Sequence, residues 1–286
     1  MRTRASDLLL TGTAPVIWGT TYIVATEFLP TFPAMTVAML RALPAGLALL
    51  LITRQLPTGI WWMRVLVLGA LNFSIFLSLL FISAYRLPGG IAATVSSVQP
   101  LLVVFLAHLV LASPVRRSSI VAALVGAIGV MLMVLTASAE LDPIGVLAGL
   151  AGAASMALGT VLSRKWQPPV SLLTFTAWQL TAGGILLLPL VLLLEPAIPI
   201  PTASNLVALA WLGVLGMALS FAVWLRGISR LDTSVVSSLL LLSPMTAVVL
   251  GWLFLDQTLD AVQITGGGLI VGSIWLAKRA IPLPRN

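Results

Sequence analysis

Apolar residues run through this sequence in long stretches that are separated by short polar segments. A helix needs about 20 mostly apolar residues to cross the hydrocarbon core of a membrane. Dividing the chain at charges, paired prolines and polar clusters gives ten such stretches. They cover residues 8–28, 34–53, 63–84, 89–111, 118–137, 143–163, 170–193, 204–226, 232–254 and 261–279. Since every connection is short, the pattern predicts an all-α polytopic membrane protein with ten transmembrane helices.

The composition excludes an ordinary soluble protein. Of the 286 residues, 59% are hydrophobic and 8% are charged, against about 25% charged in soluble domains. So few charges cannot cover a soluble surface. The chain contains no cysteine, which excludes disulfides, thiolate metal sites and a cysteine nucleophile.

The formal net charge of +7 follows from topology. When alternate loops are assigned to opposite sides, thirteen Lys and Arg fall on the side of the N-terminus. The other side carries Arg86 alone, and Arg41 lies inside the second span. Because Lys and Arg collect on the cytoplasmic side, we expect both termini in the cytoplasm. The charge therefore indicates no nucleic-acid partner.

The two halves of the chain repeat each other weakly. Shifting the sequence by 144 residues superposes Arg86-Leu87 on Arg230-Leu231, and Pro100 on Pro244. A shift of 140 residues superposes Gly19-Thr20 on Gly159-Thr160. A repeat of five spans is odd, so its second copy must cross in the opposite direction. The sequence thus predicts two inverted five-helix repeats, residues 1–137 and 138–286, an arrangement typical of secondary transporters.

Several short motifs occur in order along the chain. They are Trp18-Gly19-Thr20, Pro33 and Arg41 in the first half, and Pro244 to Leu255-Asp256, Gln263-Ile264, Gly266, Gly267, Gly268 and Gly272 in the second. In this order they resemble the EamA-type branch of the drug/metabolite transporter superfamily. The first half departs from the family pattern, since Ala112 and Ser113 stand where an acid is usual. The resemblance covers nearly the whole chain and is greatest to bacterial aromatic amino acid exporters. It implies ten helices and export of small metabolites.

Polar and aromatic side chains within the spans are the candidates for a binding site, because such groups tend to face the bundle interior or a cavity. Trp18 lies too deep in its span for an interfacial belt, and Tyr22 shares its face. The primary amides of Asn72, Gln99 and Gln179 each have four hydrogen-bond sites to satisfy. We expect the substrate-binding residues to be Trp18, Tyr22, Asn72, Ser97, Gln99, Pro100, Trp178, Gln179 and Pro244. Packing between helices is the alternative role for each.

Pro100 and Pro244 fall near the middle of equivalent spans. A proline inside a helix removes one N–H and leaves the carbonyl four residues earlier without its partner, so both spans should kink. Interruptions at corresponding places in two halves indicate a transporter binding site. We therefore expect the site where spans four and nine bend.

Two residues are candidates for a charge role. Arg41 is the only base well inside a span, and His108 is the only histidine. All eight acids lie at or near helix ends, so facilitated flow and proton exchange are both open. No metal site or cofactor is expected.

Three other functions are alternatives to an exporter of small metabolites. An intramembrane enzyme would need a catalytic pair, and His108 has no acid near it in the sequence. A channel would need a filter or a ring of like charges. A nucleotide-sugar carrier of the same superfamily would call for several inward bases, whereas only Arg41 qualifies.

The sequence therefore predicts a non-enzymatic exporter of small amphipathic metabolites, amino acids with aromatic or apolar side chains, that acts by alternating access. We expect it to be a multi-pass protein of the bacterial inner membrane that functions as a monomer, with the small-molecule substrate and the lipid bilayer as its partners.

Overall fold

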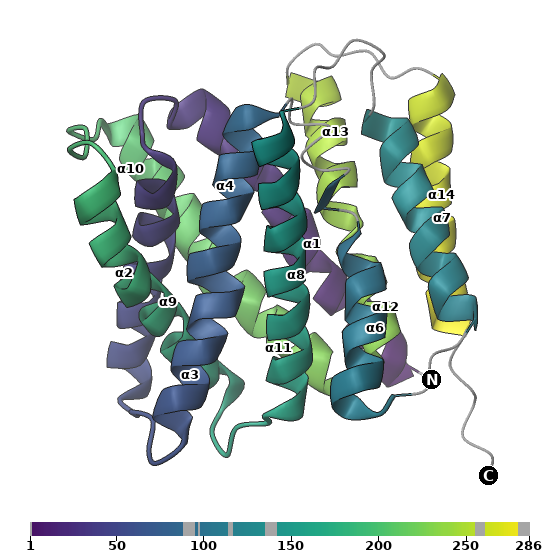
Figure 1. The fold of residues 1–286 in the computed structure, drawn as a ribbon, viewed down its shortest axis with the longest axis horizontal. Helices are drawn as coiled ribbons and strands as arrows, with labels where there is room; N and C mark the ends of the chain where they lie inside the picture. The colour runs from purple at the N-terminus through teal and green to yellow at the C-terminus, as the bar shows by residue number, and fades with distance from the viewer. Residues whose placement is uncertain are drawn as a thin grey trace.

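The computed structural model describes residues 2–87, 95–96, 98–113, 117–134, 142–254 and 261–279, and every regular element among them is a helix. The elements are α1 (Arg2–Phe28), α2 (Ala34–Thr53), α3 (Trp61–Gly69), η1 (Ala70–Ile75), α4 (Phe76–Arg86), α6 (Gln99–Leu111), α7 (Arg117–Val134), α8 (Pro143–Lys165), α9 (Leu172–Leu194), α10 (Ala203–Ala210), η2 (Trp211–Leu219), α11 (Ser220–Arg230), α12 (Thr233–Leu239), α13 (Leu242–Phe254) and α14 (Ala261–Arg279). They form a helical bundle (Figure 1).

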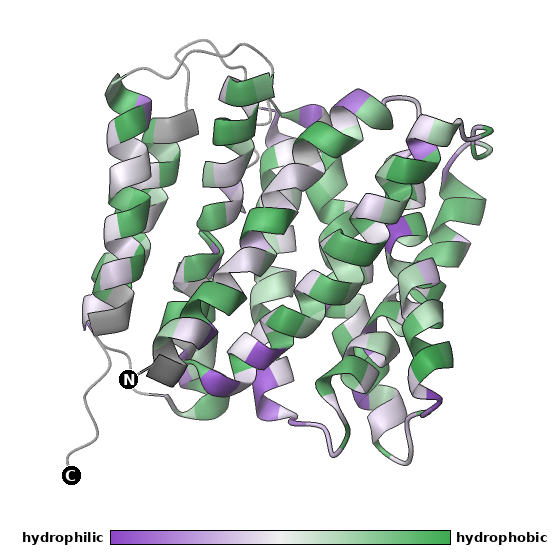
Figure 2. Cartoon of the chain, turned by 180° about the vertical axis from the view of Figure 1, so that it is seen from behind, coloured by the Kyte–Doolittle hydropathy of each residue, from purple (hydrophilic) through white to green (hydrophobic). Residues whose placement is uncertain are grey.

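Six of the helical segments are long and apolar enough to cross a membrane, and α6, α7, α13 and α14 are shorter apolar helices. Hydrophilic segments gather toward the ends of the helices, while the lengths between them are mainly hydrophobic (Figure 2). The N-terminal end of α1 and the C-terminal end of α14 lie at the same end of the bundle (Figure 1). The assignment of that end to the cytoplasm stays a prediction.

Polar side chains at the helix ends fix where several spans begin. Asp142 accepts hydrogen bonds from Ile144 N and Gly145 N at the start of α8, and Pro143 occupies its first turn. Ser171 accepts from Thr174 N at the start of α9. These side chains accept hydrogen bonds from N–H groups that have no partner within the helix.

The helices pack in matched pairs. The two most extensive contacts are between α2 and α9 and between α7 and α14, which are the second and fifth spans of the two predicted repeats. Contacts of α1 with α13 are matched by contacts of α8 with α6, and contacts of α1 with α11 by contacts of α8 with α4. Each of these contacts thus has its equivalent when the two halves are exchanged.

The crossing of α2 and α9 shows this pairing at atomic detail. A Cβ at Gly46 would lie 2.4 Å from Thr181 N, and a Cβ at Gly184 would lie 2.5 Å from Leu43 Cβ. Leu43 and Gly46 precede Thr181 and Gly184 by the same 138 residues. The two glycines therefore allow the backbones of equivalent helices to meet at equivalent points.

Two corresponding stretches depart from α-helical geometry. The π-helical segment η1 lies within the third predicted span and η2 within the eighth. Such segments are frequent at functional sites. Both contribute side chains to the cavity described below.

Candidate functional site

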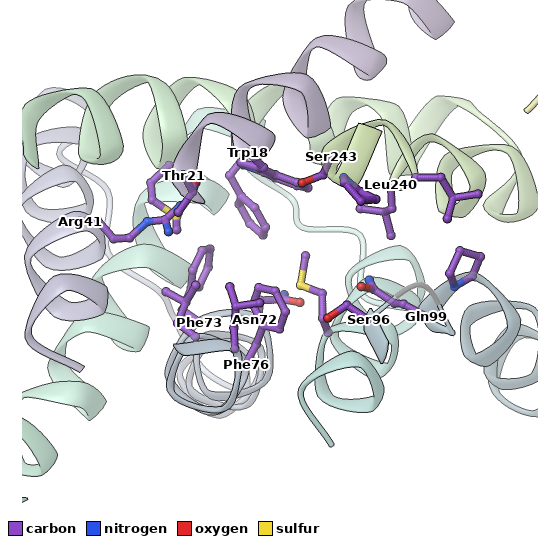
Figure 3. Close-up of a pocket in the computed structure, with 18 residues that line it drawn as sticks. Trp18, Thr21, Arg41, Asn72, Phe73, Phe76, Ser96, Gln99, Leu240 and Ser243 are labelled. Atoms are coloured by element: carbon purple, nitrogen blue, oxygen red, sulfur yellow. The ribbon is translucent and has the colours of Figure 1, made fainter. Parts of the chain in front are cut away.

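A cavity lies in the middle of the bundle, between the two halves of the chain (Figure 3). Its walls come from α1, α2, the third span (η1 and α4), α8, the eighth span (η2 and α11), and the segments around residues 96–100 and 240–244. The empty space between the lining residues is about 930 Å³ when its opening to the outside is included. The lining is predominantly apolar.

The helix breaks that flank the cavity differ from the kinks predicted from the sequence. Helix α12 ends at Leu239 and α13 begins at Leu242, so the ninth span is two helices, and Pro244 lies in the first turn of the second. Likewise α6 begins at Gln99, with Pro100 in its first turn. Proline is tolerated in a first helical turn, where its missing N–H costs nothing. The prediction of two bent helices was therefore wrong in form, although both prolines line the cavity.

The residues just before these prolines enter the cavity from opposite directions. Helix α6 occupies the lower half of the bundle and α13 the upper half (Figure 1). Gln99 and Ser243, which are 144 residues apart, both line the cavity beside Pro100 and Pro244. At the second break Ser243 N donates to Leu240 O at 3.0 Å, so this carbonyl has a partner despite the proline.

Arg41 brings a positive charge into the cavity. It lies on α2 and is only 2% exposed. Its guanidinium enters between Thr21 and Phe73 (Figure 3). The structure thus places this cation in the wall of the cavity. Among the described lining residues it is the only charged one.

Asn72 is held in place by a buried amide pair. Its Nδ2 donates to Gln179 Oε1 at 2.8 Å and lies 3.4 Å from Ser163 Oγ. A Cβ at Gly159 would lie 2.0 Å from Asn72 Oδ1, so only glycine leaves room for the amide there. Gln179 is fully buried and outside the cavity lining, whereas Asn72 lines it. Gln179 therefore positions Asn72.

Two amide atoms at the cavity have no hydrogen-bond partner among the described residues. They are Asn72 Oδ1 and Gln99 Nε2. A buried unsatisfied polar atom costs free energy. The acceptor on Asn72 and the donor on Gln99 are thus available to a polar group of a bound molecule.

Aromatic rings form much of the remaining wall. Trp18 Nε1 donates to Gly216 O at 3.0 Å and to Ser220 Oγ at 2.8 Å, which fixes the indole and satisfies its only donor. Phe73 and Phe221 meet edge to face with their centroids 4.6 Å apart. Phe76 completes this group (Figure 3). Trp18 was among the residues expected from the sequence, but the three phenylalanines were missed.

Trp178 lies elsewhere in the bundle. Its Nε1 donates to Gln55 O at 2.6 Å and its ring packs 6.4 Å from that of Trp61. It is buried but is not among the residues that line the cavity. The structure therefore does not bring Trp178 together with Trp18 in one stacking surface.

The other expected residues take no part in the described wall. His108 is exposed, with Nδ1 2.9 Å from Ser113 O, and lies outside the cavity. The side chain of Tyr22 and residue Ser97 lie outside the described residues.

The carboxylates whose contacts the structure describes lie at helix ends, away from the cavity. Asp7 pairs with Arg226 at 2.6 Å and Arg230 at 3.7 Å, and Asp142 pairs with Arg86 at 3.1 Å. The backbone N–H of Gly145 is the main cause that lowers the pKa of Asp142 below its ordinary value of 3.8. Among the described residues no group of three His, Cys, Asp or Glu could hold a metal ion.

The chain is similar to known membrane transporters over nearly its whole length. A sequence model described as the EamA-like transporter family matches residues 6–135 and again 143–279. Protein PecM of Dickeya dadantii is 43% identical over 267 residues, covering 93% of this chain and 90% of that protein. A probable amino-acid metabolite efflux pump of Salmonella typhimurium is 24% identical over 277 residues, covering 91% of each.

A solved crystal structure shares this fold. It superposes with a TM-score of 0.82 at 23% identity, covering 96% of this chain and 98% of the other. The matches to the family model span most of the chain. The chain therefore belongs to the EamA-like transporter family of the drug/metabolite transporter superfamily.

Proposed function

We propose that this protein is a secondary transporter that exports small amphipathic metabolites of the amino-acid class, with aromatic or apolar side chains, by alternating access. The observation that carries the proposal is the central cavity, which combines aromatic walls with the buried cation Arg41. An aromatic ring would lie against Trp18, Phe73 and Phe76, and a carboxylate against Arg41. Asn72 and Gln99 would bind further polar groups.

In this proposal the two moving units are inverted five-helix repeats, residues 1–137 and 138–286. Three observations support them. The family model matches the chain twice, the helix contacts occur in matched pairs, and both halves interrupt a helix next to the cavity. Rocking of one repeat against the other would expose a fixed central site to each side in turn.

The proposed setting is the inner membrane of a bacterium, with both termini in the cytoplasm. The excess of Lys and Arg on one side supports that orientation, and both relatives named above are bacterial. A chain that holds both repeats already encloses a cavity, so we propose a functional monomer. The chain has no proposed enzymatic activity, cofactor or metal.

Uptake into proteoliposomes tests the proposal. Labelled amino acids and their metabolites, sugars and nucleotide sugars would be offered with and without a pH gradient. We expect saturable uptake of at least one aromatic amino acid or aromatic amino-acid metabolite, and no uptake of sugars. Uptake of nucleotide sugars alone would contradict the proposal. So would the absence of uptake for every compound in vesicles whose integrity is verified.

A further inference from the structure

The charges around the cavity are one-sided. Arg41 is the single charged residue among the described residues of the lining, and none of these carries a carboxylate, histidine or lysine side chain. The other polar groups of the lining are neutral amides and hydroxyls, among them Asn72, Gln99 and Ser243. In the described part of the lining a bound molecule therefore meets one positively charged side chain and no negatively charged one.

This imbalance discriminates between a zwitterion and an anion. A charge that leaves water for a poorly hydrated interior needs an opposite charge or several hydrogen bonds. A carboxylate obtains both from the Arg41 guanidinium. Among the described residues of the lining an ammonium group would find only neutral acceptors, such as the unpaired Asn72 Oδ1. The lining thus favours the carboxylate and offers no charged partner to the ammonium.

We propose that the substrate is an organic monoanion, an aromatic or apolar carboxylate without a free ammonium group, and that it crosses as that anion by uniport. This inference rests on the proposed function, because it assigns a net charge to the molecule that the same cavity carries. The described lining offers Arg41 to neutralise the anion and no group that changes its protonation near neutral pH.

The transmembrane potential then drives export. A bacterial interior is electrically negative, so an anion moves outward down its electrical gradient. Each 100 mV changes the equilibrium concentration ratio of a monovalent anion by about 50-fold. A zwitterion gains nothing from the potential. Transport of an anion bound at Arg41 therefore predicts a voltage response that a carrier of neutral amino acids lacks.

Three probes with the same ring separate the alternatives in proteoliposomes. They are phenylpyruvate, phenylalanine and phenylethylamine, which carry charges of −1, 0 and +1 at neutral pH. A potential positive inside is imposed with potassium and valinomycin. We expect saturable phenylpyruvate uptake whose plateau rises by about 50-fold per 100 mV, with much slower uptake of the other two. Phenylpyruvate is a strong enough carboxylic acid that little of it crosses the bilayer unaided in its neutral form.

Substitutions of Arg41 test whether its guanidinium is the group that binds the carboxylate. Arg41→Gln should reduce phenylpyruvate uptake by about 30-fold, as expected for removal of one partner of a buried charge pair. Arg41→Lys keeps the charge and should retain the voltage response. Lys165→Gln removes one positive charge from the exposed end of α8 and serves as the matched control with wild-type uptake.

Each outcome decides between the two proposals. Preferred uptake of phenylalanine or phenylethylamine, or phenylpyruvate uptake that ignores the potential, overturns the monoanion inference and leaves the transporter proposal standing. Uptake of none of the three probes by the wild-type protein overturns the inference together with the proposed substrate class. Full phenylpyruvate uptake by a folded Arg41→Gln protein overturns the role of Arg41.

Discussion

Glu195, at the C-terminal end of α9, caps the N-terminus of α2. It follows α9, and its carboxylate accepts hydrogen bonds from Met35 N at 2.6 Å, Thr36 N at 2.7 Å and Thr36 Oγ1 at 2.7 Å. Helix α2 has Pro33 at its N-cap and receives no side-chain cap from that residue. We therefore expect Glu195→Ala to weaken the contact between α2 and α9 at this end.

The size of the loss follows from these three bonds. Losing an N-cap costs about 0.5–2 kcal/mol, and losing a negative charge at a helix N-terminus costs about 0.3–1 kcal/mol. Glu195 is half-exposed, so water reaches the freed N–H groups and keeps the loss near the middle of the combined range. We expect Glu195→Ala to lower the free energy of unfolding by about 2 kcal/mol. Glu195→Gln, which keeps one acceptor oxygen, should lose about half as much.

Thermal unfolding of the purified protein in detergent is the assay. A loss of about 2 kcal/mol corresponds to a Tm lower by about 4–8 °C for a chain of this size class. Glu27→Gln, which alters an exposed acid at the end of α1, is the matched control and should leave Tm unchanged. An unchanged Tm for Glu195→Ala, or an equal loss for Glu27→Gln, would refute the reasoning.

Three further predictions concern packing, the cavity and pH. Gly46→Ala would place a Cβ 2.4 Å from Thr181 N, so it should cost about 1–3 kcal/mol by thermal unfolding; Gly268→Ala, which has open space around it, should be neutral or slightly stabilising. Trp18→Phe removes both hydrogen bonds of the indole but keeps a ring, so KM in the uptake assay should rise several-fold while kcat changes less. Asp142→Ala should lower Tm at neutral pH, and the difference should vanish as the pH falls through the lowered pKa of Asp142, because the capping carboxylate is then protonated in the wild-type protein too.

Each of these predictions has a result that would contradict it. Equal destabilisation by Gly46→Ala and Gly268→Ala would show that the α2–α9 crossing is not close-packed. An unchanged KM for Trp18→Phe would remove the fixed indole from the substrate contacts. A Tm difference for Asp142→Ala that persists below the range where the carboxylate is ionised would show that its charge is not what stabilises the start of α8.

The sequence pattern predicted well where helices lie, because long apolar runs have few alternatives to a helix in a membrane. In the described residues each of the ten predicted stretches coincides with helix, in whole or in part. It did not predict that the ninth span divides at residues 240–241. A kink and a break both accommodate Pro244 locally, and only the packing of α12 and α13 around the cavity distinguishes them.

Helix faces were predicted better than the neighbours that those faces meet. The spacing of residues along α9 places Trp178 on a buried face, but it does not say that this face meets Trp61 and the end of α2. Phe73 and Phe76 went unnoticed because phenylalanine is ordinary in an apolar helix. Phe76 lies four residues after Asn72, which would have been the signal for it, since i and i+4 share a face. The spacing of Phe73, one residue after Asn72, gave no such signal.

Arg41 shows the opposite case, in which chemistry indicated the site before the geometry did. A charged side chain deep in a span is expensive and needs a reason. The structure places its guanidinium in the cavity wall, on the helix that packs against its own equivalent in the second half.

Substrate protection of a single cysteine tests the central claim, that the transported molecule occupies this cavity. The natural chain has no cysteine, so Ser243→Cys places the only thiol in the cavity wall. Ser118→Cys, on the exposed first turn of α7, is the control. A substrate present at ten times its Kd should slow modification of the cavity thiol by a water-soluble reagent by about 10-fold, without affecting the control. Equal modification rates with and without a transported substrate would contradict the account.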